Sequence, residues 1–243
     1  MSQEPLKPEE RIILAVDFAE FEEAEGWVKR FKGKIHTYKV GPILYLKHGK
    51  EVLSRFSELG ADLFLDLKFH DIPSTVEKTV RQLAGLNIKM FTLHALGGFD
   101  MMKRVSDSVA EEADRLSNPK PMTLAVTVLT SHDESTLNEI GINNSTKDEV
   151  LKLADVAEKT GIDGLVCSGQ ELEFVTKEFG DRFKLVIPGI RPASKTHDQK
   201  RVMTPKEAIS RGADYLVIGR AITEAENPER VVEEIISQLS PTG

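Results

Sequence analysis

The chain has 243 residues, of which 40% are hydrophobic and 29% charged, and its formal net charge is −7. This length suits one large soluble domain with a sizeable core, and the acidic balance argues against nucleic acid or an anionic membrane as partners. The single cysteine, Cys167, excludes an intramolecular disulfide and a multi-cysteine metal site. Residues 1–10 are polar, and no run in the sequence is apolar and long enough to span a bilayer. We therefore expect a polar leader over 1–10 and a cytoplasmic protein.

Short apolar segments alternate with helical patterns along the rest of the chain. Strands are expected at 11–17, 35–41, 62–68, 89–95, 122–130, 164–168, 183–189 and 214–219. Helices are expected at 18–31, 42–59, 73–84, 99–116, 147–160, 170–179, 204–211 and 228–239, with a short helical piece in the polar loop before Ser145. Eight such units predict an α/β fold, a (β/α)8 TIM barrel forming a single domain over 11–243. A doubly wound sheet is the competing fold, but no G-x-G-x-x-G follows the first strand.

The segment Asp62–Val76, D-L-F-L-D-L-K-F-H-D-I-P-S-T-V, joins an apolar strand to several charged residues. Because side chains on a strand alternate between its faces, Asp66 and Lys68 must project on the same side. Asp71 follows, just before an expected helix with Pro73 in its first turn. The sequence therefore places two carboxylates and an ammonium close to the carboxyl end of one strand.

Polar residues also end other expected strands, and the active site of a TIM barrel lies at the carboxyl ends of its strands. They include Asp17, Lys39, His94, Thr130 and Ser168. Simpler alternatives exist, since Asp17 and Asp71 are suited to cap the helices that follow them and Lys39 could be solvated. His94 is more simply read as a hydrogen-bonded core histidine, and we leave it out of the predicted site. Together the charges favour a site, because buried charges need partners.

A second cluster follows the last two expected strands, in I-P-G-I-R-P and V-I-G-R. Loops at this place in TIM barrels often bind phosphate. Gly189 and Gly219 permit close approach of backbone amides to an oxyanion, and Arg191 and Arg220 offer paired donors. Gln199, in the polar segment between them, is a further donor. Ordinary turns with two surface arginines are the alternative, but the position after both strands favours a phosphorylated small molecule. We find no metal-binding motif and no cofactor signature.

The segments D-L-K-F-H-D-I-P-S-T-V, P-G-I-R-P and D-Y-L-V-I-G-R closely resemble the bacterial orotidine 5′-phosphate decarboxylase family, and so do L-A-V-D, Y-K-V-G, T-V-L-T-S and D-Q-K-R-V-M-T-P. The resemblance runs from about Arg11 to the final helix, whereas D-x-K-x-x-D alone is shared with other phosphosugar enzymes of the superfamily. It implies decarboxylation of orotidine 5′-monophosphate to uridine 5′-monophosphate, the last step of de novo pyrimidine synthesis, without cofactor or metal.

The resemblance also implies a role for each matching residue. Lys68 would deliver a proton to C6 of the pyrimidine, with Asp66 beside the substrate carboxylate. Asp71 and Thr75 would come from the other subunit of a homodimer whose active sites lie at the subunit interface. Lys39 would join Asp66, Lys68 and Asp71 in an array of alternating charges, and together with Asp17 it would bind the ribose hydroxyls. Thr130 or Ser131 would contact the pyrimidine. The phosphate would be bound by Gln199, Gly219 and Arg220, with Pro188 and Arg191 close by.

Three other functions fit parts of the pattern. The nearest is a magnesium-dependent 3-keto-gulonate-phosphate decarboxylase or hexulose-phosphate synthase, in which the acids of D-x-K-x-x-D help to bind the metal. A sugar-phosphate epimerase or isomerase would need acid–base pairs that we do not identify. A non-catalytic nucleotide-binding protein would bind uridine 5′-monophosphate without turnover. Activity that survives EDTA would separate the expected enzyme from its metal-dependent relatives.

Overall fold

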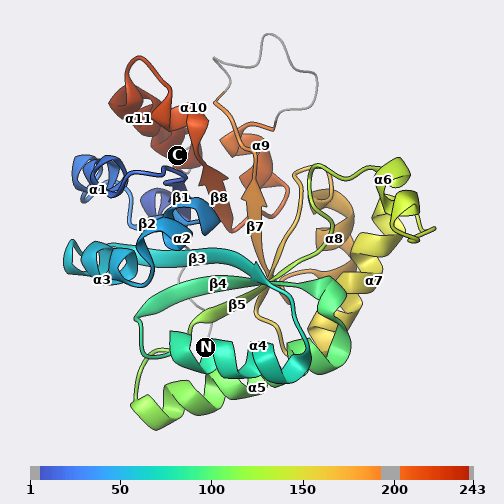
Figure 1. Ribbon diagram of the computed structural model, residues 1–243. Helices are drawn as coiled ribbons and strands as arrows, with labels where there is room; N and C mark the ends of the chain where they lie inside the picture. Colours follow the sequence, from blue (N-terminus) through green and yellow to red (C-terminus); the bar gives the residue numbers. More distant parts are fainter. Residues whose placement is uncertain (1–5, 193–202, 241–243) are drawn as a thin grey trace. The chain divides into compact units, whose positions relative to one another are not determined.

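The computed structural model describes residues 6–192 and 203–240, and its strands form a closed barrel in the order in which they follow one another along the chain. The strands are β1 (Ile12–Ala15), β2 (Thr37–Val40), β3 (Asp62–Phe69), β4 (Ile88–His94), β5 (Met122–Val126), β6 (Gly164–Val166), β7 (Lys184–Pro188) and β8 (Tyr215–Ile218) (Figure 1). The pairs β1–β2, β1–β8, β4–β5, β5–β6 and β7–β8 are all parallel. The predicted (β/α)8 TIM barrel is confirmed.

Helices separate the strands along the described chain (Figure 1). They are α1 (Phe21–Arg30), α2 (Pro42–His48), α3 (Glu51–Glu58), α4 (Pro73–Leu83), α5 (Gly98–Leu116), α6 (Glu134–Glu139), α7 (Thr146–Lys159), α8 (Leu172–Phe179), α9 (Pro205–Ser210), α10 (Arg220–Thr223) and α11 (Pro228–Leu239), with 3₁₀ turns at Pro8–Arg11 and Ala95–Gly97. The short helical piece expected before Ser145 is α6, whereas α10 was not predicted.

The single helix expected over 42–59 is wrong, because the structure has two helices there. Gly49 ends α2 with a φ of 63°, a left-handed conformation that glycine adopts without a steric penalty. Its N–H donates to the Tyr45 carbonyl, and α3 then begins at Glu51. The strand expected over 122–130 is also shorter, since β5 ends at Val126.

By its internal contacts the chain divides into two compact units. The first comprises Met1–Leu63 and Val186–Gly243 and contains β1, β2 and β8. Every residue of β1 is buried, as expected for a strand that pairs with a parallel neighbour on each side. This buried strand fixes the position of the residues that follow it, including Asp17.

The second unit, Phe64–Leu185, contains β4, β5 and β6 and the helices α4 to α8. In the register of β4 and β5, Thr92 lies opposite Leu124 and His94 opposite Val126. The amphipathic helices α4 and α5 pack side by side (Figure 1). Among the polar residues of β4, Thr92 is fully buried, whereas Lys89 and His94 are partly exposed.

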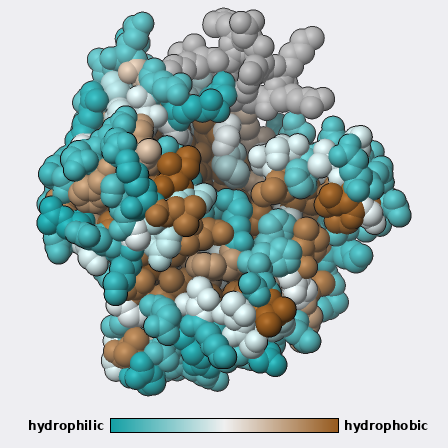
Figure 2. Space-filling model, in the orientation of Figure 1, coloured by the Kyte–Doolittle hydropathy of each residue, from teal (hydrophilic) through white to brown (hydrophobic). Residues whose placement is uncertain are grey.

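Across residues 6–192 and 203–240, none of the helices combines the length and apolar character that a membrane crossing requires. The face shown in Figure 2 is mostly hydrophilic, with hydrophobic side chains gathered in separate patches. Among the residues that the structure describes, the exposed large hydrophobic ones are Ile43, Leu46, Ile72, Leu96, Phe99 and Ile140.

Candidate active site

The carboxyl end of β3 carries an ion pair in the second unit. Lys68 Nζ lies 2.8 Å from Asp66 Oδ1, and the Asp66 side chain is only 12% exposed. The two residues are two positions apart on one strand and their side chains meet as predicted, although Lys68 itself departs from extended strand geometry with a φ of 49°. An ammonium is thereby held at hydrogen-bonding distance from a carboxylate that is largely removed from solvent.

Thr92, which our reading of the sequence missed, completes this cluster from β4. Its hydroxyl donates to Asp66 Oδ1 at 2.9 Å and accepts the backbone N–H of Lys68, also at 2.9 Å. Thr92 is fully buried, and Lys68 has a φ of 49°, which is uncommon outside glycine. No local sequence signal reveals the contact, since it depends on how β4 lies beside β3.

Asp71 and Thr75 lie at the start of α4, where both residues are exposed. Asp71 Oδ1 accepts the backbone N–H of Ile72 at 2.6 Å, whereas the N-cap residue of α4 is Ile72 itself. Asp71 therefore does not cap the helix, and its carboxylate stands at the surface of this unit beside the exposed Ile72.

The first unit carries a second ion pair, at the ends of β1 and β2. Lys39 Nζ lies 2.8 Å from Asp17 Oδ1, and the lysine side chain is 10% exposed. Asp17 does not cap α1, whose N-cap residue is Glu20. A Cβ at Gly41 would lie 2.7 Å from Asp17 Oδ1, so a side chain there would displace the carboxylate. Gly41 is thus a second residue that the sequence alone did not single out.

The expected phosphate-binding residues of the first unit follow β7 and β8. Pro188 ends β7, Gly189 has a φ of 77°, and the backbone N–H of Arg191 donates to the Met203 carbonyl at 3.2 Å. Gly219 and Arg220 follow β8 at the start of the short helix α10, with the arginine exposed. Gln199, the remaining predicted phosphate ligand, lies outside the described residues.

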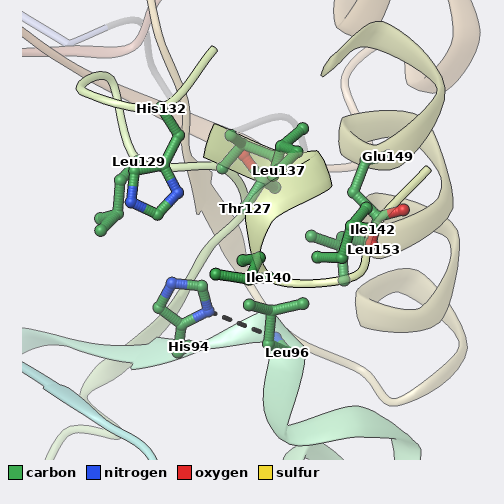
Figure 3. A pocket seen from close by; sticks show the side chains of 11 residues that line it. His94, Leu96, Thr127, Leu129, His132, Leu137, Ile140, Ile142, Glu149 and Leu153 are labelled. Carbon is green, nitrogen blue, oxygen red and sulfur yellow. Dashed lines mark hydrogen bonds between the residues drawn. The ribbon is translucent and has the colours of Figure 1, made fainter. Parts of the chain in front are cut away.

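His94 at the end of β4 lines a small cavity beside the β5–α6 segment (Figure 3). About 20 Å³ of it is open to the centre of a water molecule, room for about one water. Its lining residues are His94, Leu96, Thr127, Val128, Leu129, His132, Leu137, Ile140, Ile142, Glu149 and Leu153. Thr130 and Ser131, the residues expected at the pyrimidine, lie within this segment, between the lining residues Leu129 and His132, and are exposed.

The environment of His94 keeps its imidazole neutral. Its Nδ1 accepts the backbone N–H of Leu96 at 3.3 Å, which leaves the proton of the neutral ring on Nε2 (Figure 3). The ring stacks on His70 with 5.6 Å between centroids. Burial, aided by the charges of His70, His132 and Lys68, lowers the pKa of His94 to about 4. The hydrogen bond agrees with the expected core histidine, but the side chain also borders a cavity.

In the described ranges, no group of three or more His, Cys, Asp or Glu side chains is suited to hold a metal ion. The model of the orotidine 5′-phosphate decarboxylase / HUMPS family matches residues 10–235. The chain belongs to this family.

Relatives in the orotidine 5′-phosphate decarboxylase / HUMPS family match over nearly the whole chain. The orotidine 5′-phosphate decarboxylase of Syntrophomonas wolfei is 45% identical over 237 residues, 96% of this chain and 99% of that protein. That of Pseudoalteromonas translucida is 43% identical over 232 residues, 95% of this chain and 97% of that protein. The crystal structure of the Lactobacillus acidophilus enzyme matches with a TM-score of 0.83 and 34% identity, covering 96% of this chain and all of that one.

We predict that His94 makes folding stability depend on pH. Because its pKa in the folded state lies below the ordinary value, the unfolded chain binds a proton that the folded protein does not between about pH 6.5 and pH 4. The free energy of unfolding should therefore fall as the pH falls through this window. Urea unfolding at pH 7 and pH 5 should show a larger loss for the wild type than for His94→Asn, whose amide can still accept from Leu96. Equal losses would contradict the prediction.

Proposed function

We infer that this chain is a carboxy-lyase that decarboxylates orotidine 5′-monophosphate to uridine 5′-monophosphate, the last step of uridine 5′-monophosphate biosynthesis. Its family membership over residues 10–235 supports the reaction, as do relatives of that name that align with almost the whole chain. The structural observation that carries the inference is the Lys68 ammonium held 2.8 Å from Asp66 at the end of β3.

The chemistry requires a fixed positive charge. When the bond from C6 to the carboxylate breaks, carbon dioxide leaves and the electron pair stays on a carbon that has no adjacent electron sink. An enzyme without a cofactor must therefore stabilise this localised charge electrostatically. Lys68 supplies the charge and then transfers a proton from Nζ to C6, which gives the product; solvent returns a proton to the lysine.

Asp66 serves this step in two ways. Its carboxylate accepts a hydrogen bond from the Lys68 ammonium and so fixes the direction of that group. It also faces the substrate carboxylate, and this repulsion between like charges is relieved as carbon dioxide departs. We assign more of the rate enhancement to transition-state stabilisation, because the ammonium interacts more strongly with the carbanion than with the neutral ring carbon.

We assign the remaining residues to the same substrate. Asp17 and Lys39 bind the ribose hydroxyls, Lys39 also belongs to the charged array, and Thr130 or Ser131 contacts the pyrimidine. Gly219, Arg220 and Gln199 bind the phosphate, with Pro188 and Arg191 close by. For the described residues, support comes from their positions at or after the carboxyl ends of β1, β2, β5, β7 and β8, because the active site of a closed barrel of this kind lies at those ends. The net charge of −7 supports a small-molecule partner rather than nucleic acid, and we expect a cytoplasmic location.

The active enzyme is a homodimer with its active sites at the subunit interface, to which Asp71 and Thr75 contribute from the neighbouring subunit. Their exposure at the start of α4 supports this assignment, because an acidic side chain that does not cap its own helix is available to a neighbour. Ile72 between them is 65% exposed, and a subunit contact would remove this apolar surface from water.

Purified protein is expected to decarboxylate orotidine 5′-monophosphate in the presence of EDTA. The measurement is the loss of the ultraviolet absorbance of the substrate, with uridine 5′-monophosphate identified as the product. Activity that requires added magnesium would instead point to the metal-dependent decarboxylases of the superfamily. Binding of uridine 5′-monophosphate without turnover of the substrate would indicate a nucleotide-binding protein.

Replacing Lys68 by alanine should lower kcat/KM by at least about 10³-fold, because the proton donor and the stabilising charge are both lost. The fold should persist, since the lysine side chain is 36% exposed and fills no core site. Lys103→Ala, which removes an exposed helical lysine paired with Asp107, is the matched control and should keep wild-type activity. Steady-state kinetics and circular dichroism of both variants test this, and an active Lys68→Ala enzyme would refute the proposed mechanism.

Mixing two inactive variants should restore activity if sites are shared between subunits. In a dimer of Lys68→Ala and Asp71→Asn subunits, one site combines the intact Lys68 with the intact Asp71. Complete random exchange should therefore recover about a quarter of wild-type activity. Activity is measured after exchange has been verified with differently tagged subunits. No recovery in verified mixed dimers would place Asp71 in the site of its own subunit.

A further inference from the structure

We propose that Thr92 is a positioning residue that fixes both the Lys68 ammonium and the Asp66 carboxylate for proton transfer. The proposal rests on the roles proposed above for Asp66 and Lys68. It concerns a residue that contacts neither the pyrimidine nor the phosphate in those assignments and acts only through its hydroxyl.

The hydroxyl of Thr92 has a defined direction. It accepts the N–H of Lys68 at 2.9 Å, so its own hydrogen points to Asp66 Oδ1, which is 2.9 Å away. The same carboxylate oxygen accepts from Lys68 Nζ at 2.8 Å. One hydroxyl therefore touches the backbone of the proton donor and the carboxylate that orients its side chain.

The contact to the backbone matters because Lys68 is in the left-handed region, with a φ of 49°. This conformation is sterically unfavourable for a residue other than glycine. It also changes the direction in which the side chain leaves β3. The bond from the Lys68 N–H to Thr92 offsets part of this cost, and losing it would let the backbone relax toward ordinary strand geometry and move the ammonium.

Thr92 itself is held firmly. It is fully buried, so its hydrogen bonds are formed away from solvent, and its backbone lies opposite Leu124 in the β4–β5 register. A β-branched side chain has restricted rotation about χ1, which limits where the hydroxyl can point. The lysine and aspartate are thus oriented by a group with little freedom of its own.

The chain contains a matched arrangement away from the proposed site. Thr123, also fully buried, donates to Asp163 Oδ2 at 2.7 Å and accepts the Asp163 N–H at 3.1 Å. Asp163 likewise pairs with a lysine, Lys120, at 2.6 Å. Thr123 lies opposite Phe91, the residue before Thr92, so it projects to the other face of the sheet. Replacing Thr123 therefore shows what is lost when a buried threonine that is hydrogen-bonded to an aspartate–lysine pair is removed outside the proposed site.

The experiment compares Thr92→Val, Thr92→Ser and Thr123→Val by steady-state kinetics and thermal unfolding. Thr92→Val keeps the shape but removes the hydroxyl, and should lower kcat by about 10–100-fold with KM within about threefold of the wild type. Thr92→Ser retains the hydroxyl and should recover most of kcat. Thr123→Val should lose similar thermal stability but keep kcat. Thr92→Cys replaces Thr92→Val if the valine variant does not fold.

The pH profile separates positioning from a merely structural defect. Without the hydrogen bond from Thr92, the charged form of Asp66 is less favoured, so the acidic limb of kcat should move to higher pH in Thr92→Val. A variant that is merely less folded would show a lower kcat at every pH, with the limbs of the pH profile at unchanged pH values.

A wild-type kcat and pH profile in Thr92→Val, with Lys68→Ala inactive, would overturn the proposal. Parallel losses of kcat and stability in Thr92→Val and Thr123→Val would overturn it as well. An active Lys68→Ala enzyme would instead refute the underlying roles of Asp66 and Lys68.

Discussion

One oxygen of Asp66 accepts hydrogen bonds from both the ammonium of Lys68 and the hydroxyl of Thr92. The geometry at the end of β3 depends on this arrangement. A carboxylate that is 12% exposed has lost most of its hydration, so leaving it without donors would be costly. Its donors come from β3 and from β4, which ties the pairing of the charges to the relative position of two strands. The apolar residues Leu63 to Leu65 are buried in the core and thereby fix β3 in place.

The two strand-end ion pairs of this acidic, highly charged chain lie at the ends of β-strands, whereas many of the others join residues of one helix. Pairs such as Lys103–Asp107 and Arg230–Glu234 join neighbouring turns on the exposed faces of helices and contribute little to stability. The side chains of Lys39 and Asp66, in contrast, are 10% and 12% exposed. Charges are kept at such positions at a cost in desolvation, which is the expected signature of residues retained for chemistry.

The barrel, the family and the meeting of Asp66 with Lys68 could be predicted because each depends on a local pattern, namely strand–helix alternation, ordered motifs and the two-residue period of a strand. The break at Gly49 was missed because the apolar pattern continues across it and only the backbone conformation reveals it. Thr92 and Gly41 were missed for a different reason. Their importance arises from contacts with residues far away in sequence, Asp66 and Asp17, which no local pattern encodes.

A reaction that has no cofactor to accept electrons places unusual demands on a lysine. Its charge must already point at the reacting carbon when the substrate binds, because reorienting a solvated ammonium during the reaction would consume the stabilisation that it provides. A strand end alone does not ensure this, since lysine has four rotatable bonds and Lys68 is 36% exposed. The turned backbone at Lys68, the carboxylate of Asp66 and the buried hydroxyl of Thr92 each remove part of that freedom. Under the role proposed for Lys68, its strained backbone would be part of the mechanism, maintained by the strands on which these groups lie.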